Sequence, residues 1–289
     1  MALPTNRPPR ETPVARVGRA PMGEARERSG PPERKSLAQR SATITVMIRA
    51  AFAAAKNLKR DFGEVEHLQI SEKGPGDFVS HADIKAERTL RTELSRVRPD
   101  YGFLGEEGGE TKGDGRNRWI VDPLDGTREY SEARSDWAVH VALAVQGKPA
   151  VGAVALPALG RVLRSDRPEP VPDAPERLRM VVSRTRPAAE AVAVAAALDA
   201  EVIPMGSAGA KAMAVVRGEA DIYLHSGGQY EWDNCAPVAV ALGYGLHASR
   251  IDGTPLIYNQ ADTFMPDLLI CRRKHATLVL DTLQAAHSV

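Results

Sequence analysis

The sequence has few cysteines and almost no net charge. The first feature excludes a disulfide-stabilised protein, and the second gives no general attraction to nucleic acid or membrane. Cys235 and Cys271 cannot form a disulfide framework, and neither has a second Cys or a His at metal-ligand spacing. Both lie in apolar stretches, so we interpret them as small buried side chains in a cytoplasmic protein. The 38 basic and 37 acidic residues leave a net charge of +1.

Long apolar runs and histidine clusters are also missing. The runs at 137–145 and 191–198 are too short to span a membrane. The N-terminus lacks the apolar core of a secretory signal. Of the 7 histidines, none shows ligand spacing, and His81, His140 and His247 are interpreted as structural or exposed.

The first 40 residues differ from the rest of the chain. They are rich in Pro, Arg and Glu and have no apolar period, so residues 1–40 are predicted to be a disordered tail. This segment is either a passive extension, which includes a start codon assigned too early, or an Arg-rich contact for RNA or acidic partners. The first helix is predicted over 41–62, with Ser41 as its N-cap.

The whole sequence is 43% hydrophobic, which is enough for a core. The pattern of residues 41–289 predicts an α/β (α+β) protein. A helix is expected at 83–99, followed by strands at 118–122, 137–147 and 150–157 that have an antiparallel arrangement. From residue 178 onward, strands and helices alternate. We therefore predict two α/β subdomains, residues 41–172 and 173–289, with the Pro-rich segment 168–176 at their boundary.

The stretch WIVDPLDGT (119–127) contains the residues that first suggest a functional site. An apolar strand ends in Asp122 and Asp125, and a helix is expected to begin near Thr127. The free N–H groups of a helix start attract phosphate, whereas two carboxylates repel it. Divalent cations between carboxylates and phosphate remove this conflict, since Mg²⁺ takes oxygen ligands from both. An isolated pair of this kind is more often a solvated turn.

Three other segments place acids at the ends of elements. These are GDFVSHAD (76–83), GEE (105–107) and EWDNCAP (231–237), which contain Asp83, Glu106 and Asp233 respectively. Acids from four separate segments are what a site for several metal ions requires. The stretch at 119–127 is therefore read as part of such a site rather than as a turn.

Together, these four motifs resemble the inositol monophosphatase superfamily of Mg²⁺-dependent, lithium-sensitive phosphatases, from about residue 41 to the C-terminus. The resemblance implies a layered αβαβα fold, a metal site between the subdomains, and two Mg²⁺ ions with a third, weaker one near Glu106. It implies that a water attacks phosphorus in line, without a covalent enzyme intermediate. The metal ligands it implies are Glu106, Asp122, the carbonyl of Leu124, Asp125 and Asp233. Glu106, Thr127 and Asp83 are the implied catalytic residues, with Thr127 and Asp83 activating the water.

The residues around the motifs are similar to one branch of the superfamily. Arg128-Glu129-Tyr130 resembles the Arg-Glu-Phe of 3′(2′),5′-bisphosphate nucleotidases, which remove the 3′-phosphate from 3′-phosphoadenosine 5′-phosphate, a by-product of sulfate assimilation. The segments 206–225, 231–233 and 252–260 also look like that branch, although the spacing around Lys211 departs by about one residue. The substrate-binding residues this implies are Glu106, Leu124, Asp125, Gly126, Thr127, Arg128, Ser207, Lys211 and Asp233. Lys211 is equally well interpreted as a surface lysine without a role in substrate binding. Ser207 is more simply interpreted as a helix cap.

Other functions remain open on sequence alone. Residues before about 118 look more like bacterial inositol-1-monophosphatases, so that activity is the alternative, with fructose-1,6-bisphosphatase as a further one. A regulatory binding protein that keeps the fold is a third reading. It is disfavoured because none of the five expected metal and catalytic side chains is lost. The resemblance also implies a homodimer and a small phosphorylated substrate.

Overall fold

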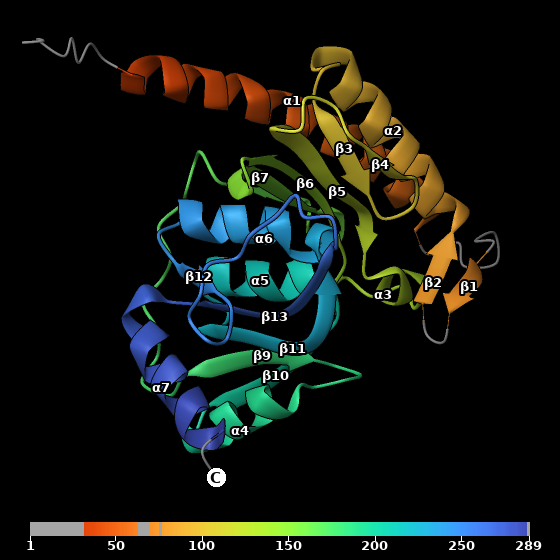
Figure 1. The fold of residues 1–289 in the computed structure, drawn as a ribbon. Helices are drawn as coiled ribbons and strands as arrows, with labels where there is room; N and C mark the ends of the chain where they lie inside the picture. The colour runs from red at the N-terminus through yellow and green to blue at the C-terminus, as the bar shows by residue number, and fades with distance from the viewer. Residues whose placement is uncertain (1–31, 63–69, 75–76, 288–289) are drawn as a thin grey trace, which may run out of the picture.

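The computed structural model describes residues 32–62, 70–74 and 77–287, and these form five layers (Figure 1). Helices α1 (Pro32–Asp61) and α2 (His81–Val97) cover the outer face of a six-stranded sheet. Helices α5 (Ala208–Val216) and α6 (Glu231–Gly243) lie between this sheet and a second one. Helices α4 (Ala189–Ala197) and α7 (Ala276–His287) cover the far face of the second sheet. The predicted αβαβα layering is confirmed.

The first sheet has the order β4-β3-β5-β6-β7-β8. β3 and β5 are parallel, and all the other neighbours are antiparallel. Its strands are β3 (Gly102–Gly105), β4 (Gly109–Thr111), β5 (Asn117–Asp125), β6 (Ala138–Val145), β7 (Lys148–Leu156) and β8 (Arg161–Arg164). The short helix α3 (Thr127–Ser131) follows β5, and the 3₁₀ turn η2 (Pro157–Leu159) precedes β8.

The second sheet has the order β10-β9-β11-β13-β12. β10, β9 and β11 are mutually parallel, whereas β13 is antiparallel to both β11 and β12. Its strands are β9 (Arg179–Ser183), β10 (Glu201–Met205), β11 (Ile222–Tyr230), β12 (His247–Ser249) and β13 (Phe264–Cys271). A 3₁₀ turn, η3 (Arg273–His275), leads into α7, and a separate hairpin pairs β1 (Ile70–Gly74) with β2 (Asp77–Ser80).

The six-stranded sheet is buried on both faces, which explains its nearly continuous apolar strands. In β6, Val139, Val141 and Leu143 pack under α1 and α2, whereas Ala138 and Ala142 face the central helices. These small side chains let α6 approach closely. At Gly152 in β7, a Cβ would lie 2.6 Å from the carbonyl oxygen of Ala236 in α6. The close packing brings the start of α6 to the end of β5.

Two of the predicted boundaries are wrong. Helix α1 begins at Pro32 rather than at Ser41, so residues 32–40 are helical and not part of a tail. They contain mostly strong helix formers, and proline is tolerated at a first helical position. Residues 1–31 lie outside the described residues. Strand β5 continues to Asp125 instead of ending at Asp122.

The predicted subdomain boundary near residue 172 falls in the connection between β8 and β9. It stays a prediction, and the central helices from the second half share one apolar core with strands of the first half. Cys235 and Cys271 are both buried, as expected. Within the described ranges, no helix is both long enough and apolar enough to span a bilayer.

Candidate active site

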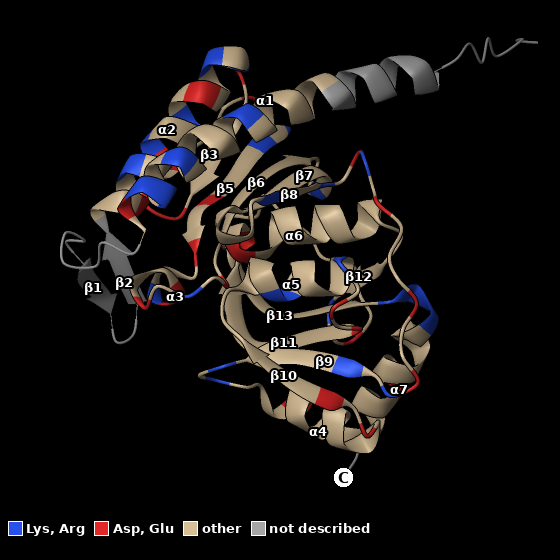
Figure 2. Ribbon diagram, turned by 180° about the vertical axis from the view of Figure 1, so that it is seen from behind, with Lys and Arg blue, Asp and Glu red and all other residues tan. Residues whose placement is uncertain are grey.

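Three aspartates converge where β5 ends and α6 begins. Asp122 and Asp125 come from β5, and Asp233 lies in the first turn of α6. One carboxylate oxygen of each lies within 4.8 Å of the others. Acidic residues appear in red at this junction in Figure 2. The three aspartates line a cavity of about 280 Å³.

A β-bulge explains how two residues of one strand reach the same cavity. Residues three apart on a regular strand point to opposite faces of the sheet. In β5, however, Asp122 pairs with His140 and Asp125 with Ala138, so the register shifts between the two aspartates. The extra residue of a bulge turns the second side chain back to the side of the first. Pro123 and Leu124 occupy this irregular step.

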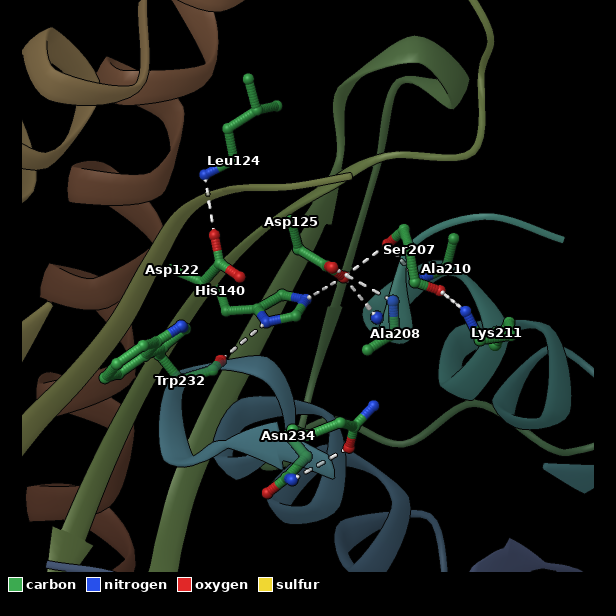
Figure 3. A network of polar contacts seen from close by, with 12 residues as sticks. Asp122, Leu124, Asp125, His140, Ser207, Ala208, Ala210, Lys211, Trp232 and Asn234 are labelled. Atoms are coloured by element: carbon green, nitrogen blue, oxygen red, sulfur yellow. Dashed lines mark hydrogen bonds and ion pairs between the residues drawn. The ribbon is translucent and has the colours of Figure 1, made fainter. Parts of the chain in front are cut away.

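Asp125 is held ionised by the start of α5 and by a histidine (Figure 3). The Ser207 hydroxyl donates to Oδ2 at 2.5 Å, and the backbone N–H groups of Ala208 and Gly209 donate at 3.1 and 2.5 Å. Nε2 of His140 lies 3.2 Å from the same Oδ2. Burial alone would raise the pKa of Asp125, but His140 and these donors lower it to about 2.

His140 joins two of the acidic segments. Nδ1 lies 3.0 Å from the carbonyl oxygen of Trp232, and Nε2 faces Asp125. The carbonyl and the carboxylate are both acceptors, so a protonated imidazole would donate to Trp232 through Nδ1 and form an ion pair with Asp125 through Nε2. Burial opposes the charge, but the carboxylate of Asp125 raises the pKa of His140 overall. The interpretation of His140 as merely structural or exposed missed this contact.

The other two aspartates have less compensation, since Asp122 accepts only the N–H of Leu124 and Asp233 only that of Tyr230 among the hydrogen bonds found in the described residues. Burial raises the pKa of Asp122 well above its usual value, and the negative charges of Glu106, Asp125 and Asp233 raise it further. The pKa of Asp233 is raised to about 7, first by burial and then by Asp125. Carboxylates held together against their mutual repulsion call for a cation between them, and Mg²⁺ prefers oxygen ligands of this kind. The donor set therefore fits the expected metal.

Two further predicted groups lie beside the aspartates. The Thr127 hydroxyl lies 3.0 Å from Oδ1 of Asp83 and 3.2 Å from the carbonyl oxygen of Leu124. Since the hydroxyl has one hydrogen, the shorter contact, to Asp83, is its best acceptor. Gly126 adopts φ 93°, a left-handed conformation that glycine tolerates, and is the N-cap of α3. The helix begins at Thr127, as expected.

Glu106 lines the same cavity but is outside the tight group of three aspartates. Its charge still raises the pKa of Asp122. The structure thus brings Glu106 to the cavity that Asp122 lines. Whether it binds metal stays a prediction.

The predicted cationic and polar residues also line the cavity. Ser207 is the N-cap of α5 and accepts a hydrogen bond from the N–H of Ala210, as its cap interpretation predicts. Lys211 is buried rather than on the surface, and its ammonium donates to the carbonyl oxygen of Ser207 at 2.7 Å. Arg128 lies at the cavity with part of its side chain exposed. Arg184, Arg186 and His225 line it too and were not predicted.

Comparison with known proteins identifies the family of the chain. Residues 39–288 match the Inositol monophosphatase family. The chain belongs to the inositol monophosphatase family. It is 45% identical over 235 residues to a 3′-phosphoadenosine 5′-phosphate phosphatase of Mycobacterium bovis, which covers 75% of this chain and 86% of the relative. The prediction of a phosphatase of this family is confirmed.

Two other relatives mark the breadth of the family. An inositol-1-monophosphatase of Rhizobium meliloti is 55% identical over 130 residues, which is 44% of this chain and 48% of the relative. The crystal structure of the extragenic suppressor protein suhB from Bartonella henselae has a TM-score of 0.73 and 29% identity, covering 84% of this chain and 98% of its own. The mixed resemblance expected from the sequence is thus confirmed.

Proposed function

We propose that this member of the inositol monophosphatase family is a Mg²⁺-dependent phosphomonoesterase that removes the 3′-phosphate from 3′-phosphoadenosine 5′-phosphate. The observation that carries the proposal is the lining of the cavity, which combines the three clustered aspartates with several arginine and lysine side chains. A substrate with two phosphates, one bound through metal and one through cations, matches this combination. The M. bovis relative, named for this activity, supports the choice of substrate.

The residues that would hold Mg²⁺ are Asp122, Asp125 and Asp233, with Glu106 and the carbonyl of Leu124 beside them. Bound there, the metal would lower the pKa of a coordinated water and stabilise charge on the phosphate oxygens. Two ions are expected, with a third near Glu106 as a further prediction. The homodimer also stays a prediction.

The chain's own groups would orient and deprotonate the attacking water. The Thr127 hydroxyl donates to Asp83, which leaves its oxygen lone pairs free to accept a hydrogen from water. Asp83 is fully buried and positions this hydroxyl from α2. The N–H groups of Gly126 and Thr127 would then bind the phosphate oxygens, and no Ser, Cys or His nucleophile is required.

The second phosphate needs a cation whose charge is not already neutralised by the protein. Arg184 donates to Glu129 at 2.9 Å and Glu132 at 2.8 Å, and the ammonium of Lys211 is buried against Ser207. Arg186, in the connection between β9 and α4, is exposed and lines the cavity. Its guanidinium has no hydrogen bond or ion pair to any other described residue. We therefore assign the 5′-phosphate to Arg186, in place of Lys211.

The test is release of phosphate by the purified protein with Mg²⁺ from 3′-phosphoadenosine 5′-phosphate, 3′-AMP and inositol 1-phosphate. We expect the highest kcat/KM for the bisphosphate. Faster release from inositol 1-phosphate would instead support the activity for which the R. meliloti relative is named. Absence of turnover with all three, and with fructose 1,6-bisphosphate, would favour a regulatory binding protein.

A further inference from the structure

Glu106 lies at the tip of a short hairpin whose turn is held by a buried acid of a neighbouring helix. The turn follows β3 and precedes β4, so its three residues are Glu106, Glu107 and Gly108. Glu87 on α2 is only 2% exposed. Its Oε2 accepts the backbone N–H of Glu107 at 2.7 Å, and its Oε1 accepts that of Gly108 at 2.8 Å. One carboxylate thus binds two consecutive peptide groups beside Glu106.

The glycines around the two acids make room for this carboxylate. A Cβ at Gly105 would lie 2.4 Å from Cδ of Glu87, and a Cβ at Gly108 would lie 2.4 Å from its Oε1. Both distances are far below an ordinary van der Waals contact, so a side chain at either position would displace Glu87. The sequence Gly-Glu-Glu-Gly at 105–108 therefore fits a turn built around Glu87.

Arg91, one helical turn after Glu87, completes the anchor. Its Nη2 lies 3.2 Å from Oε1 of Glu87 and donates to the carbonyl oxygen of Gly109 at 3.0 Å. Its guanidinium carbon also lies 4.0 Å from the ring centroid of Phe103 in β3. The positive charge compensates the buried carboxylate and joins both strands of the hairpin to α2.

The same face of α2 also carries Asp83, four residues before Glu87. Residues four apart on a helix are neighbours on one face, and both of these acids are buried. Asp83 accepts the hydroxyl of Thr127, whereas Glu87 accepts the N–H groups that follow Glu106. Helix α2 therefore contacts two segments of the site, distant in sequence, through two adjacent side chains.

We propose that Glu87 is a positioning residue that holds Glu106 in place to bind metal, an inference that rests on the proposed Mg²⁺-dependent function. A carboxylate accepts two N–H bonds at once, whereas a glutamine side chain presents one acceptor and one donor. Glu87→Gln keeps the volume but turns an NH₂ group toward one of the peptide N–H groups or toward Arg91. The turn then loses part of its anchor, and the carboxylate of Glu106 loses its fixed direction.

The experiment compares Mg²⁺ binding by the full chain and by Glu87→Gln. Outer-shell partners of metal ligands typically change metal affinity by about 10- to 100-fold. We therefore expect calorimetric Mg²⁺ affinity to fall about tenfold and half-saturating Mg²⁺ in the assay to rise to match. The kcat at saturating Mg²⁺ should stay within about threefold of the original, because the variant retains every proposed ligand.

Glu93→Gln is the matched control, since Glu93 lies on the same helix and pairs only with Arg96 among the contacts found in the described residues. It should leave Mg²⁺ affinity unchanged. If Glu87→Gln does not fold, Arg91→Lys, which removes the guanidinium fork, should show the same shift to a smaller extent. A folded variant of either kind with the original Mg²⁺ affinity overturns the inference. Absence of Mg²⁺ binding by the original chain would instead refute the proposed function.

Discussion

The hydroxyl of Thr127 lies 3.0 Å from Oδ1 of Asp83, a residue 44 positions earlier in the chain. This contact joins the start of α3 to the start of α2, next to the three converging aspartates. It is the arrangement that the proposed activation of water requires, and the sequence resemblance implied it.

Thr127→Ala should therefore lower kcat by about a hundredfold or more, since a positioned proton acceptor typically contributes that much. The change removes a small, partly exposed side chain, so the melting temperature should fall little. Initial rates at saturating Mg²⁺ and substrate measure the effect. Thr127→Ser keeps the hydroxyl and should retain most of the rate, and an alanine variant with near-normal kcat would refute the assigned role.

Asp122→Asn should reduce activity and raise stability in the absence of metal. Its buried carboxylate faces Glu106, Asp125 and Asp233, and burial with these charges raises its pKa. The amide removes that repulsion but also a proposed ligand, so kcat should fall by about a hundredfold or more. Thermal unfolding with EDTA should give a higher melting temperature than for the original chain.

The same measurement with Mg²⁺ separates the two effects. A ligand that binds only the folded state stabilises it by about 2.7 kcal/mol at a hundred times its dissociation constant. The original chain should gain this stability from Mg²⁺, whereas Asp122→Asn should gain little. A variant that is less stable than the original in EDTA would contradict the argument from repulsion.

Arg186→Ala should lower kcat/KM for the bisphosphate by roughly ten- to a hundredfold, because hydrogen bonds to charged groups contribute about 1.5–3 kcal/mol. For 3′-AMP, which lacks the 5′-phosphate, kcat/KM should be unchanged. Arg273→Ala is a control for total charge, since Arg273 is an exposed residue of η3, just after the end of β13 that pairs with the start of β11. An equal loss for both substrates would rule out recognition of the second phosphate.

Asp221→Asn should destabilise the fold in a pH-dependent way. Asp221 is fully buried and accepts hydrogen bonds from Nε of Arg179 at 3.1 Å and Nε of Arg272 at 2.7 Å. Although burial alone would raise it, these arginines lower the pKa of Asp221 below its usual value of 3.8. Breaking a buried ion pair typically costs about 3–5 kcal/mol.

The sign follows from the lowered pKa. A carboxylate with a depressed pKa stabilises the folded state above the unfolded value, and this stability is lost as pH falls through the folded value. Urea unfolding should therefore show the full difference between Asp221→Asn and the original chain from pH 7 down to about 4. The difference should shrink below that. A difference that does not change between pH 7 and pH 3 would show that the charge of Asp221 is unimportant.

The alternation of strands and helices after residue 178 could be predicted because most of these elements have their own apolar period and are bounded by turn residues, although the short strand β12 was not expected. Helix α4 (189–197), for example, lies between strands β9 and β10, in the alternation of strands and helices expected after residue 178. The metal motif was also readable, since short acidic segments at element ends are local features. The bulge in β5 was not, because it depends on how Asp122 and Asp125 pair with β6.

The contacts of His140 and Glu87 were missed for a related reason. His140 meets Asp125 and Trp232 only because β6 pairs beside β5 and α6 packs across both strands. Glu87 stands in a helix among other charged residues, and its burial against the hairpin has no sequence signal. The positions of the two glycines flanking Glu106 and Glu107 were visible, but their purpose appears only with the carboxylate in place.

The place of α6 between the two sheets has a consequence during synthesis. The inner face of β5, β6 and β7 packs on residues of α6, a helix near the end of the chain that also supplies Asp233. A nascent polypeptide released only as far as β8 exposes this apolar face and lacks one of the converging aspartates. Synthesis of α6 therefore both covers the apolar face of the first half and completes the acidic cluster.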